Sequence, residues 1–459
     1  MTDLWGGRFR GPLDERMRRF SSSLPVDRRL VRQELAQSRV HAWALREAGV
    51  LDGRQLGALD EALRRIESEV DAGSFPPEPR EPGAPEDVHA AIEERLAELC
   101  GEDGRRIHAG RSRNDQVVTS VLLWLKDASR EVEAAVRALQ RVLLERAEEY
   151  PDFVVPAYTH LQRAQSVLLA HHLLAHFEAL DRDAARLREA RTRADRCPLG
   201  AGACAGSSLP LDREEVARRL GFAAVASNSM DAVSDRDWAV EFVADCALLM
   251  VHLSRLAEDL VLWSTQEFGA FRASDAFCTG SSMMPQKRNP DLFELVRGKA
   301  ARVQGDLATL LSLLKGLPLT YNRDLQEDKE PLFDAADTAR DSARLMAAAL
   351  GEAAFLPPRA CGPDFSAATD LAEELVRRGV PFREAHGRIG RLVAACEEQG
   401  KGLEEASDAE LAAAGLDGLD RAVLTPRGSI LAKRTLGSTA PAEVARALVE
   451  ARRRLESPS

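Results

Sequence analysis

The most constraining feature of this sequence is a set of long stretches that contain neither Gly nor Pro. They run from Gln116 to Tyr150, from Leu161 to Cys197 and from Phe222 to Phe268. Because Gly and Pro are the residues that most disfavour a helix interior, each stretch can continue as one helix. The first would be about 52 Å long at 1.5 Å per residue. Within the third, apolar residues repeat at three- and four-residue steps, at Leu249, Leu253, Leu256 and Leu260.

These stretches predict an all-α protein with a bundle of unusually long helices. Ala, Leu, Arg and Glu dominate the chain, and aromatic residues make up only 5% of it. We find no alternating β-branched runs joined by hairpin turns, so we expect no sheet. Apolar stripes of this length usually face other helices, within one chain or in partner subunits, and the pattern therefore also favours a homo-oligomer.

Breaks in the helical pattern predict three helical domains. Shorter patterns, interrupted by Gly and by the Pro-rich run Phe75–Pro85, precede the long stretches, and Gly351, Pro357 and Pro358 follow them. We expect an amino-terminal helical domain at 1–112, a central long-helix bundle at 113–360 and a small helical domain at 361–459. The Pro-rich run predicts a surface loop.

Composition and charge exclude several classes of protein. Of 459 residues, 45% are hydrophobic, which excludes overall disorder, and the net charge of −11 disfavours nucleic acid as a partner. No apolar run is long enough to cross a membrane, and the amino terminus has no signal-peptide core. The seven Cys are dispersed, as is typical of reduced thiols. We expect a cytoplasmic protein.

Polar residues gather where long helices are expected to begin. Thr159 and Gln162 form a capping-box pattern, Asn289-Pro290-Asp291 is a typical helix start, and Gly110–Asp115 precedes the first long helix. Helix amino ends favour anions, and Arg111, Arg113, Lys287 and Arg288 add positive charge. If these starts converge, they form a site for a substrate with several carboxylates.

The loop Thr279–Pro290 is the most suggestive chemically. It combines Gly280, the hydroxyls of Ser281 and Ser282, and Lys287. A serine hydroxyl is a weak base, which becomes useful when backbone amides and an ammonium group stabilise its alkoxide.

These motifs carry a family resemblance. The segments Gly110–Gln116, Tyr158–Gln162 and Thr279–Pro290 resemble the fumarase/aspartase superfamily. Within it, Leu4–Phe9, Asn228–Ala232 and Thr320–Glu330 are similar to the argininosuccinate lyase family. The resemblance covers nearly the whole chain. It implies reversible cleavage of argininosuccinate to arginine and fumarate in arginine biosynthesis, without metal or cofactor. It also implies a homotetramer with a central helix bundle and active sites shared between subunits.

The resemblance assigns roles to individual residues by motif. Ser281 and His160 would be the acid–base pair, and which of them is the acid stays open. Glu294 would polarise His160, while Lys287 and Asn289 would hold the carboxylate on which charge develops. The positions that would bind substrate are Ser23, Asp87, His89, Arg111, Asn114, Thr159, Tyr321, Gln326 and Lys329. Ser23 is one of three consecutive serines, so its choice among them is a matter of alignment.

Two alternative functions remain at this point. One is another fumarate-releasing lyase, such as adenylosuccinate lyase or aspartase, which Gln286 and the run 321–329 disfavour. The other is a crystallin-like protein that keeps the fold without activity, which the presence of Ser281, His160, Lys287 and Asn289 disfavours.

Two other sequence patterns could indicate a functional site, but we assign no function to either. His172 and His176 share a helix face, but no carboxylate ligand is evident, so we expect packing or surface histidines and no metal. The glycines of 200–206 follow a helical pattern and no strand, which disfavours a dinucleotide loop.

Overall fold

The computed structural model describes residues 13–78, 84–359 and 363–456. The motif Leu4–Phe9 and residues 79–83 of the Pro-rich run lie outside the described residues. The chain forms two compact units, and each takes up several separate segments of the sequence. Unit 1 comprises 1–133, 186–247 and 302–338, and unit 2 comprises 134–185, 248–301 and 339–459.

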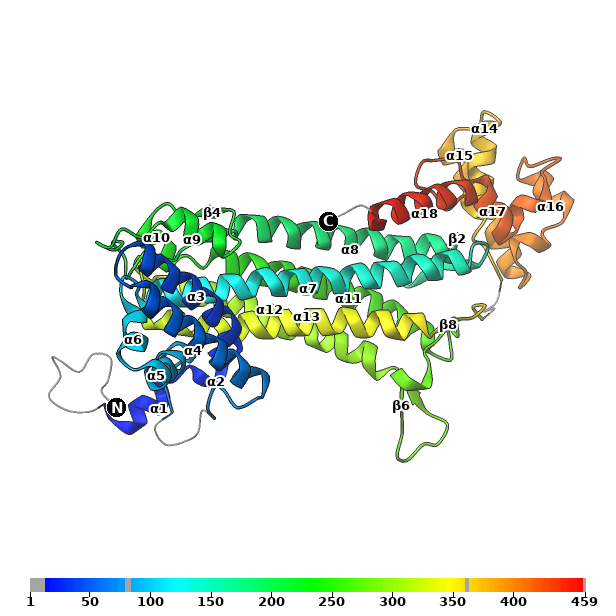
Figure 1. The fold of residues 1–459 in the computed structure, drawn as a ribbon. Helices are drawn as coiled ribbons and strands as arrows, with labels where there is room; N and C mark the ends of the chain where they lie inside the picture. Colours follow the sequence, from blue (N-terminus) through cyan, green and yellow to red (C-terminus); the bar gives the residue numbers. More distant parts are fainter. Residues whose placement is uncertain (1–12, 79–83, 360–362, 457–459) are drawn as a thin grey trace. The chain divides into compact units, whose positions relative to one another are not determined.

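Five long helices dominate the structure, as the sequence predicts (Figure 1). They are α7 (Arg113–Glu149), α8 (Leu169–Arg193), α11 (Asp237–Ser264), α12 (Asp291–Leu314) and α13 (Lys329–Gly351). Each unit contains a segment of all five helices. The apolar stripe predicted for the third stretch is buried: Leu249, Leu253, Leu256 and Leu260 are each at most 2% exposed.

Unit 1 adds short helices around these segments. They are α1 (Glu15–Ser21), α2 (Leu24–Asp27), α3 (Val31–Glu47), α4 (Gly53–Asp71), α5 (Val88–Cys100), α6 (Glu102–Arg105), α9 (Arg213–Arg219) and α10 (Ser229–Ser234). The 3₁₀ helices are η1 (Arg28–Leu30), η2 (Arg106–His108) and η4 (Arg323–Asp328), and β3 (Arg196–Cys197) pairs in parallel with β4 (Ala224–Val225). The fully buried side chains of Leu59, Leu63, Ile66 and Ile92 join α4 and α5 to the core of this unit.

Unit 2 ends in the small helices predicted for the carboxy-terminal part of the chain. These are α14 (Ala368–Arg377), α15 (Phe382–Glu398), α16 (Asp408–Ala413), α17 (Pro426–Ala432) and α18 (Pro441–Glu456), with η5 (Leu403–Glu405) and η6 (Arg421–Leu424). A hydrophobic cluster centred on Leu371, Leu375, Ile389 and Leu403 holds most of them together. The unit also contains η3 (Asp275–Phe277) and two-residue strands, β5 (Phe271–Arg272) with β8 (Ala354–Phe355) and β6 (Thr279–Gly280) with β7 (Arg288–Asn289).

One sequence prediction is wrong: the second stretch does not begin as a helix. Strands β1 (Val154–Thr159) and β2 (Gln162–Leu168) pair as an antiparallel hairpin, with Thr159 opposite Gln162. His160 and Leu161 have φ of 55° and 57°, the positive values that a two-residue type I′ turn requires. The capping box expected at Thr159 and Gln162 is therefore a hairpin turn, and α8 begins only at Leu169.

The third stretch is also interrupted, although no Gly or Pro occurs in it. The Asn228 side chain accepts hydrogen bonds from the N–H groups of Met230 and Asp231 and caps α10 at its amino end. Residues 235 and 236 then separate α10 from α11. No helix among the described residues is long and apolar enough to cross a membrane.

Candidate functional site

A cavity of about 380 Å³ lies within unit 1, where several helices begin. Its walls come from the starts of α2, α5, α7 and α13 and from the segment before α13. Among the residues that line it are Ser23, Asp27, Glu86, Asp87, His108, Ser112, Arg113, Asn114, Tyr321, Arg323, Gln326 and Lys329. The structure thus brings together six of the predicted substrate-binding residues: Ser23, Asp87, Asn114, Tyr321, Gln326 and Lys329.

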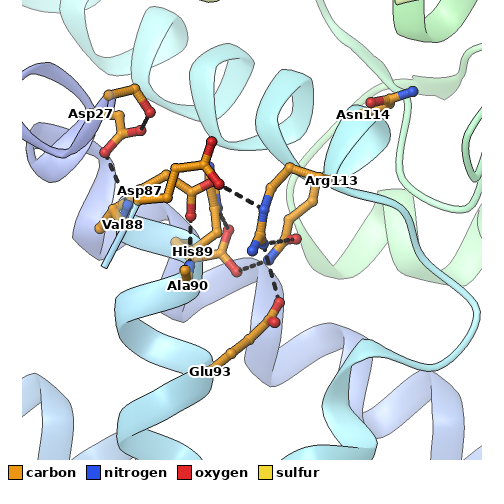
Figure 2. Close-up of polar contacts among 12 residues, drawn as sticks. Asp27, Asp87, Val88, His89, Ala90, Glu93, Arg113 and Asn114 are labelled. Carbon is orange, nitrogen blue, oxygen red and sulfur yellow. Dashed lines mark hydrogen bonds and ion pairs between the residues drawn. The ribbon is translucent and has the colours of Figure 1, made fainter. Parts of the chain in front are cut away.

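Asp87 and Arg113 form the charged centre of one wall (Figure 2). Asp87 caps α5, because its Oδ1 accepts a hydrogen bond of 2.6 Å from the Ala90 N–H. Its Oδ2 lies 3.1 Å from Arg113 Nε, and Arg113 Nη1 lies 3.1 Å from Glu93 Oε1. Burial would raise the pKa of Glu93, but a hydrogen bond from His108 and the charges of Arg113 and Arg111 hold it well below its usual range.

The start of α7 is built as the sequence predicts. Ser112 Oγ accepts a hydrogen bond from the Asn114 N–H, and the Ser112 N–H donates to Asp115 Oδ1. Asp115 Oδ2 accepts from the N–H groups of Gly200 and Gly202, which fixes the loop beside the helix start. Asn114 Nδ2 then donates to the carbonyl of Ala203 in that loop.

Ser23 is the serine of the triplet that lines the cavity. Its hydroxyl donates to Asp27 Oδ2, and Asp27 Oδ1 accepts from the Val88 N–H at 3.0 Å. Ser22 instead donates its hydroxyl to the carbonyl of Glu86, and Ser21 is buried. Burial raises the pKa of Asp27, and the charge of Asp87 raises it further.

The first residue of α13 supplies a cation, and the segment before this helix supplies a phenol. Lys329 Nζ lies 2.7 Å from Asp328 Oδ1, and the buried Arg236 binds the other oxygen of Asp328. Gln326 Nε2 donates to the carbonyl of Ser21. Burial raises the pKa of Tyr321, so its hydroxyl stays protonated at neutral pH and can donate a hydrogen bond.

His89 and Arg111, also predicted to bind substrate, lie behind the cavity wall. Both side chains are fully buried, and both contact Glu34: His89 Nδ1 lies 2.6 Å from Glu34 Oε2, and Arg111 Nη1 lies 3.5 Å from Glu34 Oε1. Gln116 and Ser120, one turn apart on α7, donate to the same carboxylate. Neither side chain lines the cavity, and both support its wall from behind.

Glu34 supports the wall of the cavity from behind, and the sequence did not lead us to expect it. Its position could have indicated burial, because Glu34 lies on the same face of α3 as the buried residues Val31, Leu35 and Ser38. A buried carboxylate requires buried partners, and Arg111, His89 and two hydrogen-bond donors of α7 supply them here.

The predicted catalytic serine lies in unit 2, between β6 and β7. Ser281 Oγ accepts hydrogen bonds from the backbone N–H groups of Met283 and Met284, at 3.2 and 3.0 Å. These are the amide donors that the loop sequence suggested, and they would stabilise negative charge on the hydroxyl oxygen. Lys287 is exposed in the same loop.

The other predicted residues of unit 2 surround this loop or lie on the hairpin. Asn289 pairs with Thr279 across β6 and β7, and the Thr279 N–H donates to Asp291 at the start of α12. Glu294 lies 3.5 Å from Arg297 Nη2. Thr159 and His160 are exposed at the β1–β2 turn. Among the described residues, no hydrogen bond or ion pair joins His160 to Glu294 or to Ser281.

Comparisons with known proteins identify the relatives of this chain. A family described as lyase matches residues 7–305, and one described as argininosuccinate lyase C-terminal matches residues 365–431. An argininosuccinate lyase of Symbiobacterium thermophilum is 50% identical over 98% of this chain and 97% of the relative. One of Desulforudis audaxviator is 49% identical over 99% of this chain and 100% of the relative.

A solved structure of EDDS lyase in complex with formate shares the fold. It superposes with a TM-score of 0.84 at 27% identity, over 94% of this chain and 87% of that chain. The alignments with these two relatives cover nearly the whole chain at about 50% identity, so no large part of the sequence lies outside them. The chain belongs to the argininosuccinate lyase family.

Proposed function

We propose that this protein catalyses the reversible cleavage of argininosuccinate to L-arginine and fumarate. The observation that carries the proposal is the 50% identity, over nearly the full length, to a protein named argininosuccinate lyase. The cavity of unit 1 and the serine loop of unit 2 supply groups that suit this reaction. Arginine synthesis is the process it would serve, and the cytoplasm is the compartment we propose, since the described cysteines are free thiols.

The charges of the cavity suit this substrate. Argininosuccinate carries three carboxylates and one guanidinium group. Arg113, Arg323 and Lys329 offer the cavity positive charge, and Asp27, Glu86 and Asp87 offer it negative charge. A wall that mixes both signs binds a substrate with both signs better than a purely cationic wall would, because each charge on the substrate finds a partner.

The chemistry is an elimination that needs one base and one acid. The base removes a proton from the succinyl carbon next to a carboxylate, and the electron pair spreads into that carboxylate as an aci-carboxylate. The electron pair of the aci-carboxylate then forms the carbon–carbon double bond of fumarate as the carbon–nitrogen bond breaks, the pair of that bond goes to the guanidino nitrogen, and the acid protonates the nitrogen. We assign the two roles to Ser281 and His160 as a pair, with Lys287 and Asn289 holding the carboxylate.

The amide donors at Ser281 support its part in this scheme. A hydroxyl that accepts from two backbone N–H groups loses its proton more readily, because the same donors bind the alkoxide more strongly than the neutral oxygen.

We further propose that each active site is shared between subunits of a homotetramer. The predicted site residues of this chain fall into two sets, one around the cavity of unit 1 and one on the exposed loop and hairpin of unit 2. In the proposed assembly, the serine loop and the hairpin of other subunits complete the cavity, and Glu294 meets a His160 from another subunit. Leu295 and Leu311 on α12 are 59% and 53% exposed, and partner helices would cover them.

The direct test is fumarate release from a panel of substrates. Purified protein is mixed in turn with argininosuccinate, adenylosuccinate, aspartate and EDDS, and fumarate is followed by its absorbance. We expect rapid release from argininosuccinate alone. Faster release from another member of the panel would assign a different substrate, and no release from any would support a crystallin-like protein without activity.

A further inference from the structure

A group of metal-ligand side chains lies in unit 2, at residues to which the proposed reaction gives no role. His172 and His176 are one turn apart on α8, and Asp259 lies on α11. Their ligand atoms all lie within 4.8 Å of one another. Among the residues that the structure describes, this is the one group of three or more His, Cys, Asp and Glu side chains arranged so closely.

Two of the three distances between these ligand atoms match those between neighbouring ligands of one ion. His172 Nε2 lies 3.2 Å from Asp259 Oδ2, and His176 Nε2 lies 3.0 Å from the same oxygen. In a tetrahedral zinc site, bonds of about 2.0–2.2 Å place neighbouring ligand atoms about 3.3 Å apart. The spacing of the three atoms is therefore compatible with one ion held between the carboxylate and the two rings. We expected no carboxylate ligand beside the two histidines, and this expectation is wrong, because Asp259 lies there. Asp259 is distant from them in the sequence, so the sequence pattern did not reveal it.

The two rings and the carboxylate face one another, since the Nε2 atoms of His172 and His176 both lie close to Asp259 Oδ2. Arg255 also carries a positive charge near His176, and that charge acts against a bound cation.

Packing fixes the orientation of one ring and leaves an approach for the ion. The Trp263 ring lies 4.6 Å from the His172 ring at an interplanar angle of 35°. The Asp259 side chain is 37% exposed, so an ion can reach the group from solvent. Two imidazoles and one carboxylate from two helices form a ligand set that suits zinc and similar ions better than magnesium or calcium.

We propose that His172, His176 and Asp259 bind one divalent ion of the zinc class per chain, with water in the fourth position. The ion links α8 to α11 and stabilises their packing. It takes no part in the elimination, for which the proposed groups are Ser281 and His160.

The test is metal binding by the purified full-length protein after removal of bound metal with a chelator. Zinc is titrated by calorimetry and cobalt by visible absorption. We expect one ion per chain, and an intense cobalt band typical of four-coordinate geometry. His176→Ala should weaken binding by more than about 100-fold, because even groups that only support a ligand are worth about 10- to 100-fold. Asp259→Asn, which preserves the shape of the side chain, should also weaken it.

His171→Ala is the matched control. His171 is also a partly buried histidine of α8, next to His172, but it is not a member of the group. This variant should bind zinc within about threefold of the unmodified protein, since adjacent residues of a helix point in different directions. Absence of stoichiometric binding would overturn the proposal, as would binding that His176→Ala and Asp259→Asn leave unchanged. In that case the three side chains form a hydrogen-bonded cluster only.

Discussion

At the scale of single residues, the reactivity of a polar group depends on the donors and charges that surround it. Ser281 is an ordinary hydroxyl in the sequence, and two amide N–H groups in the folded loop make it a candidate for proton transfer. Glu34 is an ordinary carboxylate in the sequence, and it becomes the centre of the buried polar layer behind the cavity. Both depend on groups that only the fold brings into place.

Replacement of Ser281 tests its role in proton transfer. We expect Ser281→Ala to lower kcat by at least about 100-fold while substrate still binds, because a positioned acid or base contributes about that much. Steady-state kinetics with argininosuccinate measure kcat, and calorimetry measures binding. Ser282→Ala, one residue along the same loop, is the control and should retain most activity. Near-normal turnover of Ser281→Ala would exclude this hydroxyl from the chemistry.

Replacement of Glu34 tests how much the buried polar layer contributes to stability. Glu34→Gln removes the nearer carboxylate of the buried Arg111, which keeps only Glu93 at 3.7 Å, and breaking a buried ion pair in this way costs about 3–5 kcal/mol in the free energy of unfolding. Urea denaturation measures this loss. Glu47→Gln at the exposed end of α3 is the control, and it should change stability by less than about 0.5 kcal/mol.

The same carboxylate predicts a pH dependence. Burial alone would raise the pKa of Glu34, but the charges of His89 and Arg111 and the hydrogen bonds from His89 and Gln116 lower it from 4.5 to about 2. A lowered pKa gives stability that is present above 4.5 and is lost as the pH falls towards 2. The Glu34→Gln variant should lack this part of the decline. Parallel acid-unfolding curves for the two proteins would contradict the assignment.

At the scale of elements, the long helices could be predicted and the hairpin could not. Absence of Gly and Pro with a helical stripe predicted α7 closely, since local propensity and burial agree there. The same pattern predicted α11 only in part, because its stretch begins at Phe222 and the helix begins at Asp237. The segment 154–168 shows no such agreement. Its turn residues are His160 and Leu161, whereas Asn or Gly usually occupies a type I′ turn, so the sequence pattern did not indicate a hairpin. In the fold, β1 pairs with β2, and the residues that suggested a helix cap form the turn instead.

The turn of this hairpin predicts an unusual response to substitution. Leu161 is 68% exposed with φ of 57°, a value that β-branched residues adopt at a particular cost. Leu161→Val should therefore destabilise the protein by about 1 kcal/mol, although little buried surface is lost. Leu161→Gly should be neutral or stabilising, since Gly tolerates positive φ.

Thermal unfolding of the two variants measures this difference. Leu319→Val is a control, because Leu319 is similarly exposed at 67% and is not among the residues with positive φ. It should change the Tm by less than Leu161→Val does. Equal Tm values for Leu161→Val and Leu161→Gly would show that the turn does not have the described conformation.

At the scale of the whole molecule, the fold divides the predicted site residues into two groups. Six of the nine predicted substrate-binding residues line one cavity, because their motifs are at helix starts that meet there. Ser281, Lys287, Asn289 and His160 are in unit 2. The metal-ligand group escaped prediction for a related reason: the partner of His172 and His176 is on another helix, and single-sequence patterns do not reveal contacts between distant segments.

Mixing two inactive variants tests most directly whether active sites form between subunits. His160→Ala and Ser281→Ala chains are mixed, dissociated and allowed to reassemble, and mixed tetramers are verified by mass spectrometry. If His160 and Ser281 of a site come from different subunits, random assortment leaves about one-half times one-half, or about a quarter, of sites with both residues intact. We predict recovery of a comparable fraction of unmodified activity, while each variant alone stays inactive. Verified mixed tetramers without any gain in activity would mean that one chain supplies both residues, which contradicts the shared site.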